Sequence, residues 1–366
     1  MKKKIITFIF LGFIFTFGLL HIIIPDESIS SVERRKLAIF PDFELSSNYL
    51  EEIDEYLLDH FPLRDTFRSI KANFNYHILQ KSDNNGIYLK NNYIFKSNYP
   101  TNKESITNFI NKTNKLKELF TEENTLYFMI IPDKNYYLKD KNFLSIDYQY
   151  INKELSKLDM NIIELYDILE LSDYYETDTH WKQENLNKVV KHLSTKLNFN
   201  YQDTLYKKST YNKFYGVYYG ESAINRKPET ITYLTNDIIN NVDIKYLENP
   251  NLTSVYNKSK LTSFDSYEVY LDGASSLIEI TNNNSKSNKE LIIFRDSFGS
   301  SLSPLLIEYY DKITIIDNRY ISSEYIKKYV KFNNQDILFM YSTLLINNSV
   351  TLKGWYYGRN IKILKL

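Results

Sequence analysis

The chain has 366 residues, with 45 lysines and arginines against 45 aspartates and glutamates, so its formal net charge is zero. Nucleic-acid-binding proteins usually carry a strong excess of basic residues, so the balanced charge argues against nucleic acid as a partner. The chain contains no cysteine, which excludes disulfide bonds, thiolate nucleophiles and cysteine-ligated metals. Its length suffices for one large domain or two smaller ones.

The N-terminus predicts a membrane anchor. Three lysines at positions 2–4 precede an uncharged run from Ile5 to Ile24, which is about the length that spans a bilayer. A cleaved signal peptide has a shorter apolar core and a cleavage site of small residues, and the sequence shows neither, although a removed signal peptide remains the alternative. Because lysines before a span stay in the cytoplasm, we expect a single-pass protein of the cell membrane. The remaining chain is then extracytoplasmic.

A second region is predicted between the anchor and residue 100. It begins with a linker over residues 26–50, followed by a helical pattern over residues 50–76 that Pro62 interrupts. Two short apolar runs, Ile87-Tyr88-Leu89 and Tyr93-Ile94-Phe95, are separated and preceded by Asn and Gly residues. Because Asn and Gly tolerate positive φ, this pattern predicts a β-hairpin.

From about residue 101 onward, helical and strand patterns alternate. Amphipathic stripes within residues 106–120 and 186–197 predict helices. Four short runs, at residues 126–131, 291–294, 313–316 and 337–340, are apolar apart from Thr314 and are typical of strands that are covered on both faces. The alternation predicts an α/β fold with helices on both faces of a sheet. We therefore divide the chain into an anchor (1–25), an N-terminal region (26–100) and a catalytic domain (101–366).

One candidate nucleophile directly follows a predicted strand. Ser297 stands between the run 291–294 and the start of a helix, and ligands of α/β sheets bind beyond the carboxyl ends of the strands. Its backbone N–H would lie at a helix N-terminus, where it can help to hold an oxyanion. The simpler alternative is that Ser297 or Asp296 only caps the helix.

A candidate base and its partner stand together earlier in the chain. A serine hydroxyl needs a base to take its proton, and histidine is suited to this role when an acidic group fixes its tautomer. Asp178 and His180 are two residues apart in a short polar segment, so their side chains can point the same way. Trp181 is expected to form a wall beside the histidine ring. The alternative is that His180 is a surface residue preceding a helix.

Other kinds of catalytic site find little support. The remaining histidines are His21, His60, His77 and His192; of these only His60 is a rival to His180, and a structural role is favoured for it. No zinc-type histidine pair, phosphate-binding loop or dinucleotide motif occurs, and the carboxylates are scattered rather than paired. We expect no metal and no soluble cofactor.

Taken together, these segments resemble the bacterial DHHW proteins, which are related to periplasmic alginate O-acetyltransferase proteins with an SGNH-hydrolase-like fold. The resemblance rests on Asp178-Thr179-His180-Trp181, on Arg295-Asp296-Ser297-Phe298-Gly299, and on their order along the chain. Weaker fragments at 33–35, 59–65, 85–95, 131–134, 214–216, 265–273 and 317–320 occur in the family's order. The resemblance covers most of the exported part and implies a three-layer sandwich with a mostly parallel sheet.

The resemblance also implies roles for individual residues. Ser297 would be the nucleophile, His180 the general base and then acid, and Asp178 its orienting carboxylate. Arg319 and Tyr320 would end a neighbouring strand and bind substrate, with Trp181 as a further substrate contact. The alternative for Arg319 is an ordinary salt bridge.

Two positions depart from the family's pattern. Thr179 replaces a common histidine, which leaves the Asp-x-His pair intact. Asp272-Gly273-Ala274 stands where the family often has Gly-Gly-Asn, so the chain lacks an asparagine that could contribute to the oxyanion hole.

The activity that the family implies is acetyl transfer to hydroxyls of an extracellular polysaccharide or cell-wall glycan, through an acetyl-serine. Relatives act beside a membrane-bound O-acyltransferase that supplies acetyl, and such a partner is expected here. Two alternatives are a glycan O-acetyl esterase with the same triad and a non-catalytic, membrane-tethered glycan-binding or scaffold subunit. The intact triad counts against the last.

Overall fold

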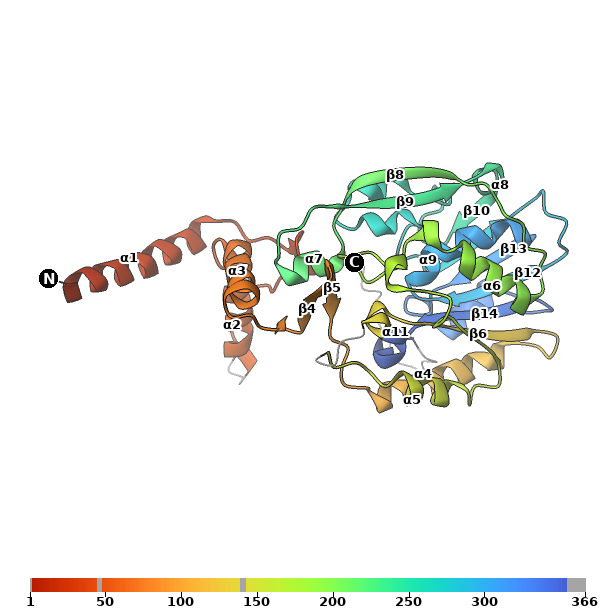
Figure 1. Ribbon diagram of the computed structural model, residues 1–366, viewed down its shortest axis with the longest axis horizontal. Helices are drawn as coiled ribbons and strands as arrows, with labels where there is room; N and C mark the ends of the chain where they lie inside the picture. The colour runs from red at the N-terminus through yellow and green to blue at the C-terminus, as the bar shows by residue number, and fades with distance from the viewer. Residues whose placement is uncertain (1, 45–47, 139–142, 354–366) are drawn as a thin grey trace.

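The computed structural model describes residues 2–44, 48–138 and 143–353. A seven-stranded sheet forms the centre of the molecule (Figure 1). In spatial order its strands are β10 (Asp243–Tyr246), β11 (Leu277–Thr281), β13 (Lys312–Ile316), β12 (Glu290–Arg295), β14 (Asp336–Ser342), β6 (Thr125–Ile131) and β7 (Asn161–Glu164). The four apolar runs that predicted strands lie in β6, β12, β13 and β14, so those predictions are confirmed.

Most of the sheet is parallel. The five strands from β13 to β7 run in one direction, whereas β11 and β10 add an antiparallel edge. In the register, Phe294 lies opposite Ile316 on one side and Phe339 on the other. Because parallel strands end on the same side, the segments that follow β6, β7, β12, β13 and β14 meet at one edge of the sheet. This edge is the carboxyl edge referred to below.

Helices cover both faces of the sheet. Leu291 and Ile293 face the hydrophobic cluster that contains α6 (Asn187–Leu197) and α9 (Phe298–Leu302). Ile292 and Phe294 face a second cluster, which contains α4 (Lys103–Leu116), α5 (Tyr148–Leu155) and α10 (Ser323–Tyr329). Alternate residues of one strand thus enter two cores, as expected for a strand buried on both faces. The predicted three-layer α/β sandwich is confirmed.

The N-terminal region contains the predicted helices and hairpin. The helical pattern around Pro62 forms α2 (Asn48–Asp59) and α3 (Arg64–Asn73), and α3 continues into a π-helical turn, Phe74–Ile78. The hairpin is β4 (Ile87–Lys90) and β5 (Tyr93–Lys96), to which β3 (Asp83–Asn84) adds a short third strand. Its two turns, Asn85-Gly86 and Asn91-Asn92, have positive φ at all four residues, so they match the twist of the strands they join.

Two parts of the chain carry structure that the sequence did not predict. The expected linker contains a short strand pair, β1 (Ile29–Ser30) with β2 (Arg35–Lys36). The long segment between α6 and β11 forms the hairpin β8 (Lys207–Phe214) and β9 (Glu229–Thr235), with α7 (Val217–Ser222) and α8 (Asp237–Asn240). Ile87 and Ile94 of the N-terminal hairpin pack against Tyr218 of α7. The N-terminal region is therefore attached to the sandwich by a small core of its own.

The predicted anchor forms α1 (Lys2–Ile23), which projects away from the rest of the molecule (Figure 1). Its segment Lys4–Ile23 is long and apolar enough to cross a membrane, and none of it is buried inside the protein. At its end nearest the sandwich, His21 Nδ1 lies 3.1 Å from the carbonyl oxygen of His60.

Candidate active site

Three candidate catalytic side chains meet at the carboxyl edge of the sheet. Ser297 Oγ lies 2.8 Å from His180 Nε2, and His180 Nδ1 lies 2.6 Å from Asp178 Oδ1. Asp178 is buried, whereas Ser297 and His180 are half-buried. The order is carboxylate, imidazole, hydroxyl, which is the arrangement in which a histidine can accept a serine proton while a carboxylate fixes its tautomer.

The turn that carries Ser297 is held by its neighbour. Asp296 Oδ1 accepts a hydrogen bond from the Phe298 N–H at 3.0 Å, and Asp296 Oδ2 accepts from the Ser342 N–H and hydroxyl at 2.8 and 2.6 Å. Asp296 therefore binds the first N–H of α9 and joins the helix to the end of β14. Ser297 occupies the N-cap position, but its side chain makes no capping hydrogen bond and its hydroxyl contacts His180 instead.

The loop that carries Asp178 and His180 is a tight turn held from two sides. It is closed by the Tyr175 N–H, which donates to the His180 carbonyl at 3.1 Å. The carboxylate of Glu229 accepts from the N–H groups of Glu176 and Thr177 at 2.8 and 2.7 Å, and from the Thr177 hydroxyl. These bonds give partners to the N–H groups of Tyr175, Glu176 and Thr177.

Lys134 satisfies the carbonyl groups of the same loop. Its Nζ donates to the carbonyl oxygens of Tyr175, Glu176 and Asp178 at 3.1, 3.1 and 2.7 Å. Lys134 is 1% exposed, and burial lowers the pKa of its amine to about 7, against the stabilising charges of nearby carboxylates, Asp178 foremost. Because one buried cation bonds three carbonyls of this loop, Lys134 is a positioning residue for the Asp178–His180 pair.

A pH-dependent stability is expected from Lys134. Below pH 7 the amine is charged in the folded and unfolded chain alike, so its burial cost is largest there. Between pH 7 and 10.5 only the unfolded chain keeps the proton, so folding becomes more favourable as the pH rises. The unfolding free energy of the wild type, measured relative to that of Lys134→Met, should therefore increase by on the order of 1 kcal/mol for each unit of rising pH.

The measurement is urea unfolding of the full chain in a mild detergent at pH 7, 8 and 9, followed by tryptophan fluorescence. A difference between wild type and Lys134→Met that stays constant across this range would contradict the depressed pKa of Lys134. Lys115→Met, on the exposed side of α4, is the control for losing a lysine at the surface.

The second oxygen of Asp178 is bound by α7. The Val217 N–H donates to Asp178 Oδ2 at 2.8 Å. This contact depends on Gly216, since a Cβ there would lie 2.2 Å from the Thr177 carbonyl oxygen. Burial alone would raise the pKa of Asp178, but the His180 imidazole, its hydrogen bond and the Arg34 guanidinium together hold that pKa well below its usual range. Asp178 therefore stays ionised at neutral pH.

Two aromatic rings hold the His180 imidazole. Tyr267 stacks on it, with ring centroids 3.9 Å apart and planes 10° apart, and Phe298 lies 5.0 Å away at a tilt. The sequence had predicted Trp181 for this wall and as a substrate contact, and the structure corrects both predictions. Trp181 has no exposed surface, and its indole N–H donates to the Phe298 carbonyl and to Ser301 Oγ at 3.1 and 2.8 Å. Trp181 therefore joins the histidine loop to α9 from inside the core.

Arg319 and Tyr320 follow β13 at the carboxyl edge, as expected. The guanidinium of Arg319 donates to both oxygens of Asp317 at 2.9 and 2.6 Å, and it lies 5.4 Å from the centroid of the Tyr320 ring. Asp317 is buried and also pairs with Arg295 at 3.4 Å. Arg319 is thus committed to a salt bridge, whereas the Tyr320 side chain is exposed. Their substrate-binding roles stay predictions.

The segment that departs from the family pattern adjoins the serine turn. The Gly273 carbonyl accepts a hydrogen bond from Arg295 Nη2 at 3.1 Å, and Leu271, Asp272 and Gly273 all have positive φ. Ala274 is exposed and offers no side-chain donor. Position 274 therefore supplies no side-chain donor to an oxyanion.

A residue of the N-terminal region also reaches the site. Arg34 Nη1 pairs with Asp265 at 3.0 Å, and Arg34 Nη2 donates to the Tyr215 carbonyl, next to Gly216. His60, the other histidine considered, has a different setting: its Nε2 lies 2.8 Å from the Ala38 carbonyl and its Nδ1 3.5 Å from Asp26. Among the described residues no group of three His, Asp or Glu side chains is placed to hold a metal ion.

Comparison with known proteins supports the fold. No family model and no curated protein matches the chain. A DHHW family protein from Eubacterium siraeum superposes with a TM-score of 0.59 and 20% identity, over 72% of this chain and 93% of that one. PatB1 from Bacillus cereus, solved with a sulfonyl adduct, gives 0.57 and 20%, over 71% and 95%.

The O-acetyltransferase domain of Pseudomonas putida AlgJ gives a TM-score of 0.43 at 9% identity, a similarity too low to argue from. The first two likenesses are enough for the fold, because each covers nearly the whole of the solved chain. The chain accordingly has the SGNH-like fold that a DHHW family protein and PatB1 share, as the sequence predicted.

Proposed function

We propose that this protein is a serine-dependent O-acetyltransferase of the cell envelope, which moves acetyl groups to hydroxyls of an extracytoplasmic polysaccharide or cell-wall glycan. The observation that carries the proposal is the unbroken chain of contacts from Asp178 through His180 to Ser297. The choice of acetyl as the acyl group and of a glycan as the acceptor rests on the DHHW-like fold and on the resemblance to alginate O-acetyltransferase proteins.

The proposed reaction has two halves. Ser297 Oγ attacks the acetyl carbonyl carbon of the donor while His180 Nε2 takes its proton, and the donor's leaving group departs with that proton. The acetyl-serine is then attacked by an acceptor hydroxyl, whose proton goes to His180 and finally to Ser297 Oγ. Asp178 stabilises the imidazolium in both halves, which its low pKa allows.

The anchor has a place in this proposal. We expect α1 to hold the protein at the outer face of the cell membrane, beside a membrane-bound O-acyltransferase that supplies acetyl. Confinement near the donor raises its effective concentration at the site. We also propose the division of the chain at residues 25 and 100 into an anchor, an N-terminal region and a catalytic domain.

The test uses the full chain in detergent, with 4-nitrophenyl acetate as donor and cello- or chito-oligosaccharides as acceptors. Mass spectrometry of the sugars should show acetylated products that are absent with Ser297→Ala. Release of acetate without acetylated sugar, equally dependent on Ser297, would favour the esterase. No turnover that depends on Ser297 would favour the non-catalytic subunit.

Asp178→Asn is expected to lower kcat by about 10²–10⁴. Both carboxylate oxygens of Asp178 accept from N–H groups, Oδ1 from the ring and backbone of His180 and Oδ2 from Val217. An asparagine amide must turn its NH₂ toward one of these donors. Either His180 then loses the acceptor that fixes its tautomer, or the Val217 N–H loses its acceptor. Steady-state hydrolysis of 4-nitrophenyl acetate measures the effect, with Asp336→Asn at the far end of β14 as the control. A kcat within a few-fold of wild type would contradict the role of Asp178.

A further inference from the structure

The helix α3 has its apolar side facing away from the protein. Toward the protein, Ala72 is buried, Arg68 donates to the Gly220 carbonyl at 3.0 Å, and Asn75 donates to Asn84 Oδ1 at 2.8 Å. The opposite side carries large apolar residues spaced three or four apart, which is one face of a helix. We call them the α3 stripe: Leu63, Phe67, Ile70, Phe74 and Ile78, which are 60%, 38%, 59%, 50% and 66% exposed.

The α3 stripe is continuous with the surface of α1. Phe17 of α1 stacks on Phe61, with centroids 5.3 Å apart and planes 8° apart, and its ring lies 5.7 Å from that of Phe67. Phe17 precedes the end of α1 at Ile23 by six residues, or about 9 Å along the helix axis. In Figure 1, α2 and α3 lie beside the end of α1 that is nearest the sandwich. The start of the α3 stripe is thus level with Phe17, which lies within the apolar span of α1.

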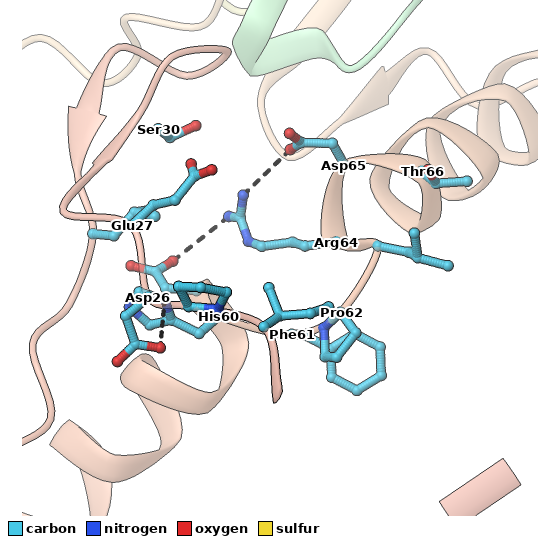
Figure 2. A pocket seen from close by; sticks show the side chains of 14 residues that line it. Asp26, Glu27, Ser30, His60, Phe61, Pro62, Arg64, Asp65 and Thr66 are labelled. Carbon is cyan, nitrogen blue, oxygen red and sulfur yellow. Dashed lines mark ion pairs between the residues drawn. The ribbon is translucent and has the colours of Figure 1, made fainter. Parts of the chain in front are cut away.

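Polar groups lie on the other side of this junction. A pocket of about 250 Å³ at the foot of α1 is lined by Asp26, His60, Arg64 and Asp65, among others (Figure 2). In it, Arg64 lies 3.7 Å from Asp65, and His60 lies 3.5 Å from Asp26. The charged side chains at this junction therefore pair with one another around the pocket, and Leu63, which also lines it, begins the α3 stripe.

We infer that the α3 stripe is embedded in the outer leaflet of the membrane that α1 spans. A helix with one apolar and one polar side lies in a bilayer interface with its apolar side in the acyl region. Lipid is the occupant that the structure favours, because the stripe touches α1 at Phe17, and the apolar side chains of α1 are exposed along its length. A contiguous apolar surface of this kind is not expected in water. The inference depends on the proposed anchor and not on the proposed acetyl transfer.

The absence of cysteine makes a direct test simple, because single-cysteine variants of the full chain can be labelled at one site. Ile70→Cys, Phe74→Cys and Ile78→Cys would carry an environment-sensitive fluorophore in vesicles of phosphatidylcholine and phosphatidylglycerol, with and without spin-labelled acyl chains. Phe15→Cys in α1 reports insertion of the anchor, and Lys115→Cys on the exposed side of α4 reports the aqueous phase.

Quenching at the three stripe positions should approach that at Phe15 and exceed that at Lys115. Adding Ile70→Glu and Phe74→Glu should reduce the quenching at Ile78. If Phe15 is quenched while the stripe positions behave like Lys115, the inference is overturned. The α3 stripe would then be a surface for a protein partner rather than for lipid. If Phe15 is not quenched, the anchor itself fails and the inference falls with it. Neither result changes the hydrolysis of 4-nitrophenyl acetate, so failure here is separable from failure of the proposed activity.

Discussion

Ser297→Ala is expected to reduce acetyl turnover by at least about 10³-fold, since loss of the nucleophile in a serine triad leaves only binding and oxyanion stabilisation. The folded protein should be almost unaffected, because the side chain is half-buried and the turn is held by Asp296 rather than by Ser297. A melting temperature within a few degrees of wild type is therefore expected.

The measurement combines kinetics with covalent labelling. Phenylmethanesulfonyl fluoride, which reacts with activated serine hydroxyls, should modify the wild type at Ser297 and leave Ser297→Ala unmodified. Acid quenching during turnover should trap an acetyl group on the same residue. Ser322→Ala is the matched control, since Ser322 is another half-buried serine beyond the end of β13. Ser297→Ala with full turnover, or labelling on a different serine, would refute the assignment.

Gly216→Ala should impair both stability and catalysis. Gly216 has an ordinary φ of −71°, so backbone strain is not the cause of the expected effect. The cause is steric overlap, because the new Cβ would lie 2.2 Å from the Thr177 carbonyl oxygen and 2.4 Å from the Asp178 nitrogen. α7 must then retreat, and Asp178 loses its bond from the Val217 N–H. Overpacking of this kind costs about 1–3 kcal/mol, and displacement of a catalytic group can cost about 10²-fold in rate.

The control for Gly216→Ala is Gly86→Ala. Gly86 has φ of +76° in a hairpin turn, with no atom closer than 3.9 Å to a new Cβ. That variant should lose stability through backbone strain but keep its kcat. Thermal unfolding and kcat, measured on both variants, separate the two effects. A Gly216→Ala protein that is destabilised with an unchanged kcat would show that the contact between α7 and Asp178 is only structural.

The sequence predicted those strands and turns whose signal lies within a few neighbouring residues. Buried parallel strands read as continuous apolar runs, and Asn-rich turns give a hairpin, so β12, β14 and β4–β5 could be placed from sequence. The Asp178–His180 pair was accessible for the same reason, because two residues in one turn meet without help from the rest of the chain. Ser297 could be paired with it only through the resemblance, since it lies 117 residues away.

The supporting groups could not be predicted, because they come from distant segments. Lys134 and Glu229 bind the histidine loop across more than 40 residues of sequence, and no periodicity marks such contacts. The Pro-x-Lys fragment at Lys134 was the only available signal. Trp181 was misplaced for a simpler reason: neighbours in an extended segment point to opposite sides. Where His180 faces the site, Trp181 faces the core, and the stacking ring comes from Tyr267.

The contact between Arg34 and Asp265 has a further consequence for where the protein can work. A Cβ on Gly220 would lie 1.7 Å from the Val32 carbonyl oxygen, so the chain leaving α1 is pressed against α7, and Arg34 pairs with Asp265 two residues later. A flexible linker would let the serine sample a broad range of heights above its anchor. Here that range is narrow, so under the proposed function a glycan acceptor would have to supply the movement. Acceptor hydroxyls would be modified in a thin layer at one height, as successive lengths of glycan pass through it.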